Sequence, residues 1–189
     1  AAATGMELEP VVSGPIVQPT YEAWYGVPQM PRIDLQNPVA RQYMIDVTTR
    51  WITEHGVDGW RMDVVRYMDH DFWVDVRQAV RAARSDTYLL AEVMGDSRRW
   101  LRGDEFDSAM NYTFRDLCID FFARRAINAE EFGAGYLRLL AMYSPAVTQV
   151  SHNLLGSHDT PRFLHLAGED ERQLLLATAF QMTVPGAPG

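Results

Sequence analysis

Cysteine is nearly absent from this sequence, because Cys118 is the only one in 189 residues. A single cysteine cannot form an intramolecular disulfide, and it cannot supply a cysteine-rich zinc site. Cys118 lies between Leu117 and Ile119, so we expect it to be a small buried apolar side chain. We therefore expect neither a disulfide nor a cysteine-rich zinc site to stabilise the chain.

Basic residues are outnumbered by acidic ones, 17 against 25, and the net charge is −8. Nucleic-acid binding requires a basic face, so we expect no nucleic-acid partner. An acidic surface is not attracted to anionic lipid, and no apolar run is long enough to span a bilayer, so we expect no membrane partner either. Residues 1–7 lack the basic and apolar segments of a signal peptide. These absences leave the cellular location open and slightly favour the cytoplasm.

The sequence also lacks internal repeats and low-complexity segments. Its hydrophobic content of 47% is enough for one sizeable core. The clearest helix begins at Asn37, a good N-cap, with Pro38 at the first helical position and Gly56 as a stop. Further helices are expected at residues 70–84, 113–125, 129–143 and 169–182, and strands at residues 57–64, 88–93, 106–110 and 148–155.

Strands that alternate with helices indicate βαβ units and a parallel sheet. Doubly wound sheets and eight-stranded barrels share this rhythm, but no glycine-rich phosphate loop follows any expected strand. Asp63, Glu92 and Asp159 each lie at or just after the carboxyl end of an expected strand. Barrel enzymes assemble their sites at these ends, which favours a barrel, although only about four strands are found instead of eight.

Arg61 and Asp63 are two residues apart in an expected strand, so their side chains project from the same face. A neighbouring guanidinium keeps a carboxylate ionised, as a glycosyl nucleophile requires. A purely structural ion pair at the end of a strand is an equally open interpretation of this segment.

Glu92 closes a short apolar run, and a carboxyl group in apolar surroundings tends to keep its proton. A retained proton suits a general acid near neutral pH. The alternative is a glutamate that caps a following turn.

His158 and Asp159 are adjacent after the last expected strand, where both could bind sugar hydroxyls. The turn-forming residues around them support a structural turn as the alternative. A metal site is disfavoured because Arg61 is a permanent cation and His158 has no second histidine at ligand spacing. Ser157, His158 and Asp159 are consecutive, so they cannot form a nucleophilic triad.

Three segments together resemble the conserved regions of the α-amylase family, the family 13 glycoside hydrolases: DGWRMD at residues 58–63, LAEV at 90–93 and LGSHDTPR at 155–162. Secondary matches are MPRIDL at residues 30–35, FDSAMNY at 106–112 and PGAPG at 185–189. The sequence YEAWYG at residues 21–26 is similar to the neopullulanase and cyclomaltodextrinase branch. Many relatives carry Asn where this chain has Ser157.

This resemblance implies a retaining α-glucan hydrolase in which Asp63 is the nucleophile, Glu92 the general acid/base and Asp159 the third catalytic carboxylate. It implies that Arg61 orients Asp63 and that His158 contributes hydrogen bonds in the transition state. The substrates would be starch-related oligosaccharides or cyclodextrins with α-1,4 or α-1,6 bonds. A glucanotransferase or isomerase on the same scaffold, or a non-catalytic carbohydrate-binding protein, are the alternatives.

The implied fold is α/β, a partial (β/α)8 TIM barrel with roughly strands 4–7 and their helices in residues 37–189. Residues 1–36 would be part of the excursion after strand 3. Trp24 and Tyr25 in that segment are candidates for stacking on sugars, and core packing is as open for either ring.

The family's earliest motif, an Asp followed by Asn-His after strand 3, is absent, and none of the five histidines lies in that context. Strands 1–3 and the eighth strand with its helix are therefore expected to be missing, and we interpret the chain as a fragment. An open half-barrel exposes strand edges and apolar faces, so we expect this chain alone to aggregate or to be inactive. The resemblance allows Ca²⁺ binding and a homodimer in an intact protein.

Overall fold

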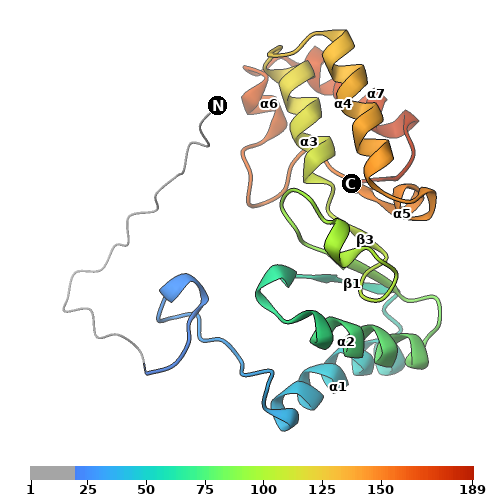
Figure 1. Ribbon diagram of the computed structural model, residues 1–189. Coiled ribbons are helices and arrows are strands. Elements are labelled where there is room, and N and C mark those ends of the chain that lie inside the picture. The colour runs from blue at the N-terminus through green and yellow to red at the C-terminus, as the bar shows by residue number, and fades with distance from the viewer. Residues whose placement is uncertain (1–19) are drawn as a thin grey trace.

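The structure is a computed structural model that describes residues 20–189, in which short strands alternate with helices (Figure 1). The strands are β1 (Gly59–Met62), β2 (Tyr88–Ala91), β3 (Ser108–Ala109), β4 (His152–Asn153) and β5 (Ala187–Pro188). The helices are α1 (Pro38–His55), α2 (His70–Ala83), α3 (Tyr112–Cys118), α4 (Ala129–Met142), α5 (Pro145–Val150), α6 (Phe163–Leu166) and α7 (Glu171–Thr183). Short 3₁₀ turns are η1 (Trp24–Gly26), η2 (Val65–Tyr67) and η3 (Arg98–Trp100), and a π-helical turn, η4 (Ile119–Ala123), extends α3. The signal-peptide prediction for residues 1–7, and most of the predicted segment 1–36, lie outside the described residues.

The strands follow one another in space in their order along the chain. β1 pairs with β2 and β2 with β3, both in parallel. A parallel bridge between Met110 and His152 connects this sheet to β4, which pairs in parallel with β5. Parallel strands in chain order, with helices between them, form an arc of a (β/α)8 barrel and confirm the predicted fold class.

Helix α1 confirms the prediction made from its end signals. The side chain of Asn37 accepts hydrogen bonds from the backbone N–H groups of Val39 and Ala40, and Gly56 ends the helix in the left-handed conformation. The buried face of α1 contains Ile45 and Ile52 and packs beside α2. None of the described helices combines the length and the apolarity that crossing a membrane requires.

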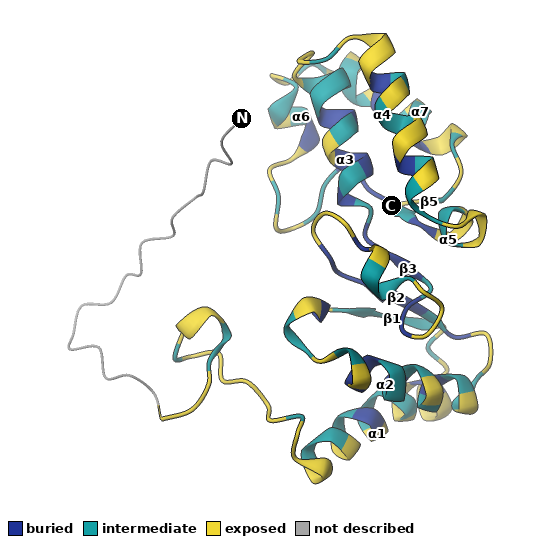
Figure 2. Ribbon diagram, viewed as in Figure 1, coloured by how far each residue is buried: buried dark blue, intermediate teal, exposed yellow. Residues whose placement is uncertain are grey.

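Two hydrophobic cores lie along the arc, with buried positions on the inner faces of the helices and exposed positions outside (Figure 2). The first core lies between the β1–β3 sheet and helices α1 and α2. The second lies among α3, α4 and α7, where the rings of Phe114 and Phe180 stack with centroids 5.8 Å apart. A third, smaller cluster of buried residues lies where the β1–β3 sheet meets β4 and consists of Leu90, Met110, Tyr112 and Leu154.

The predicted strand at residues 148–155 is wrong over its first three residues, which belong to helix α5. Pro145 occupies the first turn of this helix, and the hydroxyl of Ser144 accepts a hydrogen bond from the N–H of Val147 at 3.3 Å. This N-cap starts a helix that continues into the residues where a strand was expected. The strand that remains is β4.

The eighth strand was expected to be missing, but the last residues form a short strand after β4, so this prediction is wrong for these residues. The N–H of Ala187 donates to the carbonyl of Ser151 at 2.8 Å, and the N–H of Gly189 donates to that of Asn153 at 2.9 Å. The side-chain amide of Gln181 donates to the carbonyls of Asn153 and Gly189. These distant partners make Ala187–Pro188 a fifth parallel strand.

The first prediction concerns the close approach of β1 and β2. A Cβ at Gly59 would overlap the carbonyl oxygen of Tyr88 on the paired strand. Gly59→Ala should therefore lower the free energy of unfolding of the full gene product by about 1–3 kcal/mol, as measured from its urea midpoint. The control is Gly133→Ala in α4, where a Cβ meets nothing within 4 Å; it should raise stability by about 0.5–1 kcal/mol. Equal midpoints for the two variants would contradict this packing.

The second prediction concerns Cys118 in the second core. Burial raises the pKa of its thiol to about 12. Because the thiolate is the reactive form, iodoacetamide at slightly alkaline pH should leave Cys118 unmodified in the folded protein and alkylate it in urea. Peptide mass spectrometry measures both rates. Alkylation at the same rate with and without urea would show that the second core is not formed.

Candidate active site

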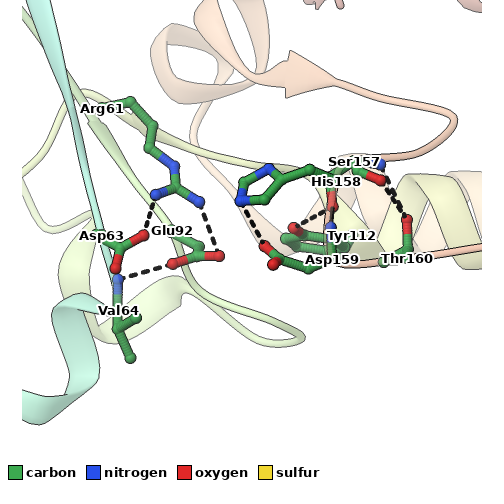
Figure 3. A network of polar contacts seen from close by, with 9 residues as sticks. All are labelled: Arg61, Asp63, Val64, Glu92, Tyr112, Ser157, His158, Asp159 and Thr160. Carbon is green, nitrogen blue, oxygen red and sulfur yellow. Dashed lines mark hydrogen bonds and ion pairs between the residues drawn. The ribbon is translucent and has the colours of Figure 1, made fainter. Parts of the chain in front are cut away.

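The three predicted carboxylates lie where parallel strands end. Asp63 follows β1, Glu92 follows β2, and Asp159 lies in the turn after β4. Figure 3 shows Asp63 and Glu92 around the guanidinium of Arg61 and, as a second group in the same view, the pair formed by His158 and Asp159. Carboxyl ends of neighbouring parallel strands meet at one edge of a sheet, which is why residues distant in the sequence gather here.

Arg61 on β1 contacts two of these carboxylates. Its Nη1 pairs with Oδ1 of Asp63, and its Nη2 lies 2.8 Å from Oε1 of Glu92. The second contact is an ion pair without the geometry of a hydrogen bond. The sequence predicted the pair with Asp63 from their spacing in the strand, whereas the pair with Glu92 depends on the neighbouring strand. A cation between two like charges offsets their repulsion.

Glu92 and Asp63 differ sharply in exposure. The side chain of Glu92 is 8% exposed and that of Asp63 is 72% exposed. The prediction that Glu92 is buried is confirmed, but its carboxylate is not in apolar surroundings. Its Oε2 accepts a hydrogen bond of 2.8 Å from the backbone N–H of Val64, and Arg61 lies at the other oxygen. Both partners hold the carboxylate in place beside Asp63.

Val64, the residue after Asp63, has a strained backbone. Its φ of 42° and ψ of 47° place a β-branched residue in the left-handed region. Such a conformation costs about 1–3 kcal/mol and is concentrated at functional sites. Here it directs the Val64 N–H at the carboxylate of Glu92. The residue after Asp63 therefore holds Glu92 in place.

Asp159 is held in a turn formed by its neighbours. The N–H of Asp159 donates to Oγ of Ser157 at 3.2 Å, and the N–H of Ser157 donates to Oγ1 of Thr160 at 2.9 Å. Nε2 of His158 lies 3.4 Å from Oδ2 of Asp159. The imidazole of His158 is largely exposed and therefore accessible to a ligand. The turn predicted from composition thus exists, and it presents both polar side chains.

Tyr112 is a site residue that was not predicted from the sequence. It is the last residue of the matched segment 106–112, which carried no site assignment. It is buried, and its hydroxyl donates to Oγ of Ser157 at 3.1 Å. Burial raises the pKa of Tyr112, and the charges of Glu92 and Asp159 raise it further, whereas Ser157 and Arg61 lower it. The Tyr112 hydroxyl therefore lies close enough to Glu92 and to Asp159 for both charges to affect its pKa.

Trp24 and Tyr25 lie apart from the carboxylates and pack on Tyr67 in the loop after β1. The ring of Tyr25 is 5.0 Å from that of Tyr67 and 4.6 Å from that of Trp24, centroid to centroid. A hydrogen bond with Tyr25 raises the pKa of Tyr67. Tyr25 is 70% exposed, whereas Trp24 is partly buried.

The side chains of Asp63 and Asp159 reach the solvent, whereas that of Glu92 is buried. A hollow of about 480 Å³ lies at the opposite ends of the strands, where its lining includes Tyr88 and Asp107, and it contains none of the three. Within residues 20–189, no cluster of three or more acidic, histidine or cysteine side chains is placed to hold a metal ion.

Known proteins match most of this chain. A sequence model of the alpha-amylase catalytic domain matches residues 18–189. Cyclomaltodextrinase of Geobacillus thermopakistaniensis is 44% identical over 171 residues, which are 90% of this chain and 29% of the relative. Neopullulanase 2 of Thermoactinomyces vulgaris is 44% identical over 162 residues, which are 86% of this chain and 28% of the relative. The chain thus spans less than a third of the length of these curated relatives.

Solved structures agree with the sequence matches. The cyclic α-maltosyl-(1→6)-maltose hydrolase of Arthrobacter globiformis superimposes with a TM-score of 0.88 at 36% identity. The match covers 93% of this chain and 39% of the hydrolase. One family model matches nearly the whole chain, and a solved relative has the same arrangement of strands and helices. This chain therefore belongs to the α-amylase family and forms part of its catalytic domain.

Proposed function

We propose that the protein containing this chain is a retaining α-glucan hydrolase, with Asp63 as nucleophile and Glu92 as general acid/base. The observation that carries the proposal is the guanidinium of Arg61 between these two carboxylates on neighbouring strands. Retaining glycosidases hold their two carboxyl groups about 5–5.5 Å apart. One guanidinium that contacts both carboxylates supports a short separation of this kind.

The proposed reaction is a double displacement. Glu92 gives its proton to the glycosidic oxygen as the bond to the anomeric carbon breaks, and Asp63 attacks that carbon to form a glycosyl ester. Glu92, now a carboxylate, then takes a proton from water. The resulting oxygen nucleophile attacks the anomeric carbon, and Asp63 leaves as a carboxylate. The exposure of Asp63 supports its role as the attacking group, because a sugar can reach it.

Asp159 and His158 are proposed to bind the hydroxyls of the reacting sugar. A negative charge close to a ring that becomes positive stabilises the transition state more than the ground state. The exposed imidazole of His158 beside Asp159 supports a shared contact with one sugar unit.

We assign residues 37–189 to the barrel and residues 1–36 to the excursion after the third barrel strand. Within the excursion, Tyr25 is the better candidate for stacking on a sugar, because its ring is 70% exposed. Trp24 supports that ring edge-on at 4.6 Å. Because Tyr25 packs on Tyr67 in the loop after β1, a sugar stacked on Tyr25 would bind next to that loop.

The names of the relatives support the substrate class that we propose. They include a cyclomaltodextrinase, a neopullulanase and a hydrolase of cyclic α-maltosyl-(1→6)-maltose. We propose that this protein cleaves α-1,4 bonds, and also α-1,6 bonds, in starch-related oligosaccharides or cyclodextrins. Comparing hydrolysis of cyclodextrin with that of starch tests this class. Products longer than the substrate, formed when an acceptor sugar is added, would identify a glucanotransferase instead.

The third prediction tests the nucleophile. Asp63→Asn in the full gene product should lower kcat on a cyclodextrin by several orders of magnitude without lowering the unfolding temperature, because the amide cannot form the glycosyl ester. The matched control is Asp58→Asn just before the same strand, where the carboxylate is fully exposed and, among residues 20–189, forms an ion pair with Arg84 alone. That control should keep its activity. Near-normal activity of Asp63→Asn would refute the assignment.

The fourth prediction separates the acid from the nucleophile. Glu92→Gln should lower kcat on an oligosaccharide by about 10²–10⁴-fold, because the leaving oxygen is no longer protonated. On a glycosyl fluoride, whose leaving group needs no proton for departure, the loss in the first step should be much smaller. Asp63→Asn should lose activity on both substrates. Equal losses of Glu92→Gln on the two substrates, in a burst-phase measurement, would contradict its role as acid.

A further inference from the structure

Tyr112 lies at the junction between the two halves of the arc. It is the first residue of α3, three residues after the end of β3, and it is buried in the third cluster with Leu90 of β2 and Leu154 after β4. Its ring therefore packs between the strand before Glu92 and the segment before Asp159. Figure 3 shows its hydroxyl directed at Ser157.

Ser157 is the centre of the turn that presents Asp159. Its Oγ accepts two hydrogen bonds, at 3.1 Å from the Tyr112 hydroxyl and at 3.2 Å from the N–H of Asp159. The bond from Asp159 is internal to the turn, whereas the bond from Tyr112 comes from another part of the fold. The Tyr112 hydroxyl therefore connects the turn at residues 157–160 to the part of the fold that contains β2, the strand before Glu92.

We propose that Tyr112 is a positioning residue of the active site, whose hydroxyl fixes Ser157 and thereby aims the Asp159 carboxylate at the sugar beside Asp63 and Glu92. This inference rests on the proposed function, in which Asp159 is the third catalytic carboxylate. The bond with Ser157 supplies orientation and makes no contact with substrate. Small displacements of such a group cost catalysis far more than they cost stability.

A purely structural tyrosine is the competing explanation, and Tyr136 in α4 is its matched control. The hydroxyl of Tyr136 is buried in the second core and has no hydrogen-bond partner in the described residues. Tyr136→Phe therefore removes a buried hydroxyl without breaking a bond, at a distance from the carboxylates. It should leave kcat and KM unchanged.

The fifth prediction compares Tyr112→Phe, Ser157→Ala, the double variant and Tyr136→Phe in the full gene product on a cyclodextrin. Tyr112→Phe and Ser157→Ala should each lower kcat by about 10- to 100-fold with KM changed little, because a displaced Asp159 acts mainly in the transition state. The double variant should lose no more than the larger single loss, because both changes remove one interaction. Ser157→Thr, which keeps the hydroxyl, should recover most of the kcat lost in Ser157→Ala.

The outcomes separate this inference from the proposed function. If Asp63→Asn is inactive and Tyr112→Phe retains the kcat of Tyr136→Phe, the role of Tyr112 is overturned and the proposed function stands. Additive losses in the double variant, or a kcat loss that is matched by an equal loss in Tyr136→Phe, also overturn it. If Asp63→Asn retains activity, the proposed function fails and this inference fails with it.

Discussion

The parallel register of β1 on β2 is the constraint on which the site depends. Met62 pairs with Ala91, and the N–H of Glu92 donates to the carbonyl of Met62 at 2.9 Å. This register places the residue after each strand at the same level, so that Asp63 and Glu92 meet beside one guanidinium. The register requires a close backbone approach, which the absence of a side chain at Gly59 permits.

Two carboxylates held this close repel each other, and the local structure offsets that repulsion. Arg61 supplies a positive charge to both, and the N–H of Val64 supplies a donor to Glu92. The strained conformation of Val64 is the energetic cost of aiming that donor. Such an arrangement is typical of a site in which chemistry, and not stability, sets the geometry.

Helix α1 leaves several large apolar side chains exposed to solvent. Side chains on the outer face of α1, such as Val39, Tyr43 and Trp51, are exposed although they recur at helical spacing with Ile52. Their spacing is that of a helix, but it does not identify the buried face of that helix. Burial depends on which elements cover a helix, and a helical period alone does not contain that information.

The sequence by itself determined the elements whose signals are local. Asn37, Pro38 and Gly56 defined the ends of α1, and the carboxylates at strand ends indicated a barrel site. Only the tertiary structure decided that residues 148–150 are helical, that Ala187–Pro188 pairs with β4, and that Tyr112 reaches Ser157. The contacts between Val64 and Glu92 and between Tyr112 and Ser157 join residues 28 and 45 positions apart. Such contacts arise from how the strands pack together, and no short sequence pattern records that packing.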